Sequence, residues 1–113
     1  SIDFLPANQI DENKILAIRH KFNKDAKIMV TACRLTPWKG VDGIIRTLPK
    51  IKLAAGDVHF MVLGDGSELD NLKALAKQLG VAENVHFMGA IRHDEVVNYL
   101  KAADLFILNS NYE

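Results

Sequence analysis

Two basic side chains, Arg34 and Lys39, stand on one short segment, residues 34–40, which reads Arg-Leu-Thr-Pro-Trp-Lys-Gly. Arginine offers a planar fork of N–H donors and lysine a mobile point charge, and both bind phosphate oxygens. A strand-like apolar run precedes the segment and a helix-like stretch follows it, so unpaired N–H groups at the helix start add positive potential. This pattern predicts a site for a phosphate or diphosphate; the alternative is a pair of solvated surface charges.

Three further segments follow apolar runs and carry groups that can bind a ligand. Gly64, Asp65 and Gly66 form a turn in which glycine permits positive φ and a close approach to a ligand, although the same tripeptide also makes an ordinary strand-to-helix turn. Residues 89–93 offer backbone groups and one apolar contact to a flat base, or form a plain connecting loop. The carboxylate of Glu113 can accept hydrogen bonds from sugar hydroxyls, or is merely a charged terminus.

Short apolar runs of strand type alternate with longer stretches of helical periodicity. Ser67 with Asp70 predicts a capping box, and Gly80 predicts a C-terminal helix cap. Pro49 lies inside a predicted helix, so we expect a kink or a break near residue 48. In chain order we predict a helix at 12–22 capped by Asp11, a strand at 28–33, a helix at 41–54, a strand at 58–63, a helix between Ser67 and Gly80, a strand at 85–88, a helix from its cap Asp94 to Ala102, and a strand at 105–108.

Strict alternation of strands and helices predicts an α/β fold: a Rossmann-like parallel sheet with right-handed crossovers and helices on both faces. In open sheets of this kind, ligands bind beyond the carboxyl ends of the strands. The segments 34–40, 64–66, 89–93 and 109–113 all follow predicted strands, so this rule gathers the candidate residues at one edge of the sheet. A length of 113 residues fits one domain.

Composition argues against several classes of partner. Fourteen basic residues balance fourteen acidic ones, so no global field draws the chain toward nucleic acid or an anionic membrane. Cys33 is the single cysteine and no secretory signal pattern is present, so we expect a cytoplasmic setting. No apolar run approaches the roughly 20 residues of a spanning helix. Any peripheral membrane contact of the full-length protein would have to come from other parts of it.

The remaining chemistry-bearing motifs are absent or scattered. Neither a Gly-x-Gly-x-x-Gly fingerprint nor a P-loop occurs, and no Gly-x-Ser-x-Gly elbow supports a hydrolase. We expect His59 and His86 to lie within strands, His20 on a helix and His93 in a loop, without converging. None shows metal-ligand spacing with Cys33, so we predict no metal site.

Taken together, the segments after the strands resemble the C-terminal domain of the large retaining glycosyltransferase family, group 1 or family 4, which has the two-Rossmann-domain GT-B architecture. The first residues, Ser-Ile-Asp, are also similar to the Gly-Val-Asp that opens this domain. The family pattern is Arg-Leu-x-Pro-x-Lys-Gly, Gly-Asp-Gly, Asn-Val-x-Phe-x-Gly, Ala-Ala-Asp and Tyr-Glu, and the chain carries it in that order at 34–40, 64–66, 84–89, 102–104 and 112–113.

The resemblance implies that residues 1–113 are part of the domain that binds a nucleotide-diphosphate sugar, the donor of the transferred sugar. Arg34 and Lys39 would hold the diphosphate and stabilise it as the leaving group, and the turn 64–66 would lie against the donor nucleotide. Preplaced cations suit a departing diphosphate where no metal serves, so a metal-independent reaction without a cofactor is expected.

The same resemblance assigns the nucleoside and sugar contacts. Ile91 would touch the base, with Arg92 in the segment that flanks it. Glu113 would be the first of two glutamates, eight positions apart, that contact the donor sugar and the ribose. Two departures stand out, because the sequence ends before the second glutamate and Cys33 occupies a position where the family usually has glycine.

The N-terminal acceptor domain of the family is not in this sequence, so we expect the chain to be inactive alone. One alternative is a non-catalytic α/β interaction or regulatory module resembling a receiver domain, but its acidic cluster is missing because Asp65 stands largely alone. Another is part of a GT-B-fold epimerase or phosphorylase. A helix expected after the last strand is also missing, so we predict exposed apolar surface and self-association, a swapped element or marginal stability.

Overall fold

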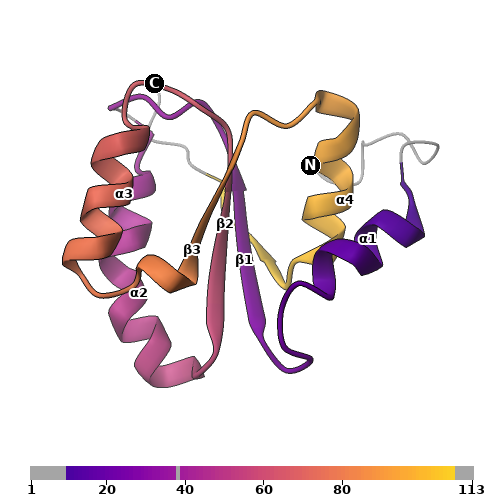
Figure 1. The fold of residues 1–113 in the computed structure, drawn as a ribbon, viewed down its shortest axis with the longest axis horizontal. Helices are drawn as coiled ribbons and strands as arrows, with labels where there is room; N and C mark the ends of the chain where they lie inside the picture. Colours follow the sequence, from indigo (N-terminus) through magenta and orange to yellow (C-terminus); the bar gives the residue numbers. More distant parts are fainter. Residues whose placement is uncertain (1–9, 38, 109–113) are drawn as a thin grey trace.

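A computed structural model describes residues 10–37 and 39–108. It contains one parallel sheet of four strands, in the order β3-β2-β1-β4, with helices on both faces (Figure 1), which confirms the α/β prediction. The strands are β1 (Lys27–Ala32), β2 (Val58–Leu63), β3 (Val85–Gly89) and β4 (Leu105–Phe106).

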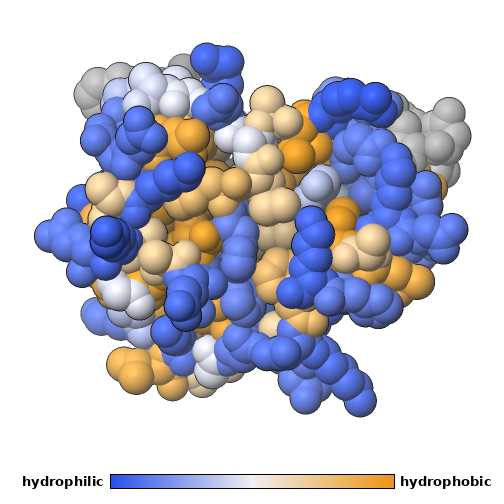
Figure 2. Space-filling view, viewed as in Figure 1, coloured by the Kyte–Doolittle hydropathy of each residue, from blue (hydrophilic) through white to orange (hydrophobic). Residues whose placement is uncertain are grey.

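Two helical layers enclose the sheet. Figure 1 shows α2 (Val41–Ala55) and α3 (Leu69–Gln78) on one side, and α1 (Glu12–Arg19) and α4 (His93–Ala102) on the other. A short 3-10 helix, η3 (Ala82–Asn84), leads into β3. In the space-filling view, hydrophilic side chains cover most of the helical surfaces, and apolar ones show between the two layers (Figure 2).

The central strands are apolar on both faces because each face is covered by helices. Along β1, Ile28 and Val30 pack toward α1 and α4, whereas Met29 packs toward α2 and α3. Phe60 of β2 and Leu48 of α2 are fully buried in the core between the sheet and the helices α2 and α3. The alternation of β1 side chains between two cores explains why the run 28–33 lacks a polar face.

Two predicted helix ends are confirmed in detail. The carboxylate of Asp11 accepts hydrogen bonds from the backbone N–H groups of Asn13 and Lys14, and so caps α1. Gly80 has φ 75° and its N–H donates to the carbonyl of Lys77, while the next N–H donates to the carbonyl of Ala76. This pair of bonds is the Schellman arrangement that a glycine cap favours.

Other helix boundaries differ from the prediction. The helix α2 runs without interruption to Ala55, so there is no break at Pro49; the alternative expected there, a kink, stays a prediction. Ser67 and Asp70 form no capping box: the N–H of Glu68 donates to the carbonyl of Leu35, which holds the chain in a turn, and α3 begins one residue later.

The caps at the start of α4 and at the end of α1 also differ. Asp94 lies inside the first turn of α4 rather than at its cap, and its carboxylate accepts from the guanidinium of Arg92. The helix predicted to reach residue 22 ends at Arg19. The N–H of Phe22 then donates to the carbonyl of Arg19, three residues earlier, and the turn places the Phe22 ring against His59 of the sheet.

The last strand is shorter than predicted. Only Leu105 and Phe106 belong to β4, although the N–H of Ile107 still donates to the carbonyl of Val30 at 2.8 Å. Leu105 and Leu108 are 55% and 67% exposed, in line with the expected apolar surface near this end of the sequence. Self-association itself stays a prediction.

Two histidines do converge, contrary to the sequence prediction. His59 of β2 and His86 of β3 lie on the same face of neighbouring strands, with Nδ1 of His59 2.8 Å from Nε2 of His86. Nε2 of His59 lies 2.9 Å from a carboxylate oxygen of Asp57, and Phe22 packs on both rings. A carboxylate only accepts, so in the neutral pair His59 donates to Asp57 and accepts from His86. Sequence spacing gave no signal for this pair, because strand register brings the residues together.

This cluster predicts a loss of stability at mildly acidic pH. Burial, and then the charge of His59, lower the pKa of His86 below its ordinary value of 6.5. The unfolded chain therefore takes up a proton at His86 more readily than the folded chain, so the free energy of unfolding falls as the pH drops below about 6.5 and is unaffected by this group well above it.

Thermal unfolding at about pH 7.5 and about pH 5.5 measures this loss. His86→Asn should show a smaller fall in melting temperature between the two pH values than the unsubstituted chain, whereas the control His20→Gln, at an exposed position, should not. An equal fall in all three proteins would show that the pair has no such effect.

Candidate functional site

A pocket of about 340 Å³ lies at the carboxyl ends of the strands. Residues 32–34 at the end of β1 and 63–65 at the end of β2 line the pocket, and the loop after β3 supplies Ala90 and Ile91. Val96 of α4 completes the lining. The structure thus brings together four of the predicted site residues: Arg34, Gly64, Asp65 and Ile91.

Leu35 anchors the loop that carries Arg34. Its side chain is fully buried in the core beneath α2 and α3, its N–H donates to the carbonyl of Asp65 at 2.9 Å, and its carbonyl accepts from the N–H of Glu68 at 2.9 Å. The neighbouring Arg34 side chain is exposed. One buried apolar residue therefore fixes the backbone while the adjacent cation faces the pocket.

The glycines of the 64–66 turn serve the contact between the two loops. A Cβ at Gly64, which has φ 140°, would lie 1.8 Å from the carbonyl oxygen of Cys33, and a Cβ at Gly66 would lie 2.4 Å from that of Leu35. Such distances are far inside van der Waals contact, so only glycine fits. The close approach predicted for these glycines is therefore made here by the protein's own backbone. The carboxylate of Asp65 accepts from the N–H of Gly66 at 2.8 Å.

Lys39 lies at the far end of the same loop, half-buried, and its N–H donates to the carbonyl of Thr36 at 3.3 Å. Gly40 follows with φ 77° as the N-cap of α2, and it has no side chain to satisfy the first N–H groups of the helix. Lys39 does not line the pocket of Arg34. It stands instead beside the positive end of α2.

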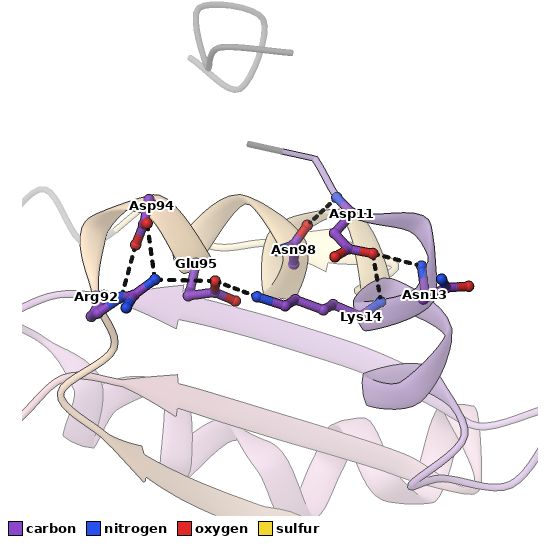
Figure 3. A network of polar contacts seen from close by, with 7 residues as sticks. All are labelled: Asp11, Asn13, Lys14, Arg92, Asp94, Glu95 and Asn98. Carbon is purple, nitrogen blue, oxygen red and sulfur yellow. Dashed lines mark hydrogen bonds and ion pairs between the residues drawn. The ribbon is translucent and has the colours of Figure 1, made fainter. Parts of the chain in front are cut away.

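Arg92 is turned away from this pocket. Its Nε and Nη2 donate to the two carboxylate oxygens of Asp94 at 3.1 and 3.0 Å, and Nη2 lies 3.5 Å from Glu95. Its side chain borders a separate polar depression with Lys14 (Figure 3). Ile91 and Arg92, predicted together as nucleotide contacts, therefore face different sides of the loop. Glu113 lies outside the described residues.

Five lining residues were not predicted as contacts, and two of them, Ala32 and Leu63, are the last residues of β1 and β2. Ala90 directly precedes Ile91, so its place in segment 89–93 was the available signal. The sequence marked Cys33 only as a departure from the family's glycine. In the structure Cys33 is half-buried and lines the pocket. Val96 lies inside α4, where helical periodicity assigns an apolar residue to the core, so no sequence signal marked it as a pocket residue.

A second groove lies between α2 and α3, with a volume of about 290 Å³. Four of its lining residues belong to the Arg34 loop, namely Leu35, Thr36, Pro37 and Gly40. Glu68 caps α3, and the remaining lining residues, such as Arg46, Asn71 and Gln78, lie on α2 and α3. No residue of the loop after β3 reaches it. The strand-end pocket is therefore the place where segments after three strands meet.

The structure describes residues 10–37 and 39–108. In this part of the chain, no group of three or more histidine, cysteine, aspartate or glutamate side chains is placed to hold a metal ion. The helices described here are also too short or too polar to cross a membrane.

The pocket lies at the carboxyl ends of parallel strands, which is where open α/β sheets bind their ligands, so the fold defines a Rossmann-like α/β domain. Comparison with known families agrees with the fold. The family described as glycosyl transferases group 1 matches residues 13–113. The chain belongs to this family.

Relatives of known name extend well beyond this sequence. A GDP-mannose-dependent monoacylated alpha-(1-6)-phosphatidylinositol monomannoside mannosyltransferase of Corynebacterium glutamicum is 34% identical over 107 residues, which are 93% of this chain and 27% of that protein. The GPI3 subunit of the phosphatidylinositol N-acetylglucosaminyltransferase of Saccharomyces cerevisiae is 29% identical over 107 residues, 95% of this chain and 23% of that protein. The chain thus spans about a quarter of these relatives.

Solved structures share the fold. A glycosyltransferase from Rickettsia africae superposes with a TM-score of 0.77 at 20% identity, covering 96% of this chain and 29% of that one. WaaG, a glycosyltransferase involved in lipopolysaccharide biosynthesis, gives 0.74 at 23% identity, covering 92% and 29%. HepE from Anabaena, in complex with UDP and glucose, gives 0.72 at 25% identity, covering 88% and 28%.

The loop contact generates a stability prediction. Gly64→Ala places a methyl group 1.8 Å from a backbone oxygen and forces φ 140° on a residue with a side chain, so we expect a loss of more than about 2 kcal/mol in the free energy of unfolding. Gly43→Ala is the matched control: its Cβ would meet nothing within 4 Å in the first turn of α2, and a change of at most about 1 kcal/mol, stabilising, is expected. Urea unfolding of both variants measures the difference, and equal stabilities would contradict the account.

Proposed function

We propose that this chain is the donor-binding part of a retaining glycosyltransferase, which moves a sugar from a nucleotide-diphosphate sugar to an acceptor. The observation that carries the proposal is the exposed Arg34 at a pocket formed by three post-strand loops, in a chain that belongs to the glycosyl transferases group 1 family. The likeness to HepE, whose structure holds UDP and glucose, supports a nucleoside diphosphate as the bound group.

In the proposed mechanism, cations bind the diphosphate and stabilise it as the sugar departs. Negative charge grows on the leaving group in the transition state, so donors fixed in advance lower the barrier. Arg34 supplies forked N–H donors from a loop fixed by Leu35, and Lys39 adds a second cation beside the start of α2. These charges make the proposed reaction independent of a metal ion.

The apolar side of the pocket suits the nucleoside. Ala90 and Ile91 project from the loop after β3, and Val96 faces them from α4. A flat base buries apolar area against such side chains, and Gly64 and Asp65 of the 64–66 turn line the same pocket. We further propose that Glu113 contacts the donor sugar, as the family resemblance implies.

The complete activity would require an acceptor-binding domain. Because the chain spans 27% and 23% of two relatives, we propose that it acts as one part of a longer enzyme in the cytoplasm and is inactive alone. The names of those relatives carry two different sugars, mannose and N-acetylglucosamine, so the proposal is for a nucleoside diphosphate sugar as a class.

Nucleotide binding by the chain tests the proposal. Isothermal titration with UDP, GDP and ADP should find at least one that binds, and Arg34→Ala or Lys39→Ala should each weaken it by about tenfold or more, because a hydrogen bond to a charged group contributes about 1.5–3 kcal/mol.

Matched controls are Arg46→Ala and Lys50→Ala, two exposed cations of α2 outside the strand-end pocket. Both should bind like the unsubstituted chain. Binding of none of the three nucleotides, or an equal loss in all four variants, would refute the proposed site.

A further inference from the structure

The first turn of α4 has a different neighbour on each side. Ile91 and Val96 line the strand-end pocket, whereas Arg92, Asp94 and Glu95 border the polar depression next to α1. The loop after β3 runs directly into this turn, and the carbonyl of Arg92 accepts from the N–H of Glu95 at 2.9 Å. Any group that fixes Arg92 and Glu95 therefore also fixes the residue that precedes them, Ile91.

A network of ion pairs fixes Arg92 and Glu95. Figure 3 shows the guanidinium of Arg92 bridging Asp94 and Glu95, with Lys14 of α1 reaching Glu95 from the other side. The Lys14 Nζ lies 2.6 Å from the Glu95 carboxylate, and this hydrogen bond raises the pKa of Lys14 above its ordinary value. Glu95 is thus the charge that joins the two cations.

A part-buried hydrogen bond between the N–H of Asp11 and the side chain of Asn98 joins the start of α1 to α4. The side chain of Asn98, on the next turn of α4, is 1% exposed, and its carbonyl oxygen accepts from the N–H of Asp11 at 2.9 Å. Asp11 in turn caps α1 (Figure 3). The start of α1 is therefore a fixed support from which Lys14 can hold Glu95.

The polar depression itself is a poor place for an anion. It is lined by four acidic residues and two basic ones, Lys14 and Arg92. Both cations already have carboxylate partners within hydrogen-bond distance. A diphosphate there would meet net negative charge, so Arg92 is badly placed to bind the donor directly.

We propose that Arg92 and Glu95 are positioning residues, which hold the loop after β3 so that Ile91 is presented to the nucleoside part of the donor. This inference rests on the proposed function, because it assigns the nucleoside to the Ile91 side of the pocket. Exposed ion pairs are individually weak, but the two-pronged bond between Arg92 and Asp94 and the sharing of Glu95 make a network, for which a modest effect is expected.

Binding of a nucleoside diphosphate and of inorganic pyrophosphate to the same variants tests this role. Glu95→Gln and Arg92→Gln should each weaken nucleoside diphosphate binding about twofold to tenfold and leave pyrophosphate binding unchanged, since the diphosphate is held by the Arg34 loop. Glu12→Gln, which removes another carboxylate from the same depression, should change neither affinity. Thermal unfolding confirms that each variant is folded.

The direction of the Glu95→Gln effect is decisive. If Arg92 bound the donor directly, Glu95→Gln would free its guanidinium and remove a repelling charge, so nucleoside diphosphate binding would become tighter; that result overturns the inference. Unchanged binding in both variants, or an equal loss for both ligands, also overturns it. If the unsubstituted chain binds pyrophosphate and no nucleoside diphosphate, or binds neither, the proposed function fails as well, which separates the two failures.

Discussion

The loops that follow β1 and β2 touch backbone to backbone, and two walls of the strand-end pocket depend on this contact. Leu35 exchanges hydrogen bonds with the carbonyl of Asp65 and the N–H of Glu68, and it buries its side chain in the core. Gly64 and Gly66 allow the approach, because any Cβ there would collide with a carbonyl of the opposite loop. The same contact delays the start of α3 and leaves Arg34 exposed beside the pocket.

Two residues of the family pattern, Asn84 and Asp104, bind backbone groups of neighbouring strands and do not line the pocket. The amide of Asn84 donates to the carbonyl of Val58 at 2.9 Å and so ties the start of β3 to β2. The carboxylate of Asp104 accepts from the N–H of Ile28 at 2.8 Å and from Arg19 at 3.0 Å, which fixes the start of β4 against β1. In this chain, Asn84 and Asp104 therefore serve the geometry of the sheet.

The sequence predicted the layers of the fold because apolar periodicity reports which faces are buried. It placed β2 from Val58 to Leu63 without error and found the Gly80 cap, since both depend on local patterns. The sequence did not predict boundaries that depend on contacts between segments distant along the chain. The start of α3 depends on Leu35, which lies more than thirty positions earlier in the chain.

The candidate site was likewise predicted where fold topology determines it and missed where contacts between particular side chains determine it. Arg34, Gly64, Asp65 and Ile91 meet as predicted because parallel strands end at one edge of the sheet. The orientation of Arg92 depends on the carboxylates of α4, and the pairing of His59 with His86 depends on strand register, so neither could be derived from spacing along the chain.

The central claim is that a nucleoside diphosphate binds at the ends of β1, β2 and β3. Backbone amide chemical shifts of the isotope-labelled chain, followed during titration with the nucleotide that binds, locate the ligand residue by residue. The account predicts the largest changes at Arg34, Asp65 and Ile91, on the three loops that form the pocket. Changes confined to the groove between α2 and α3, at residues such as Asn71 and Gln78, would contradict it.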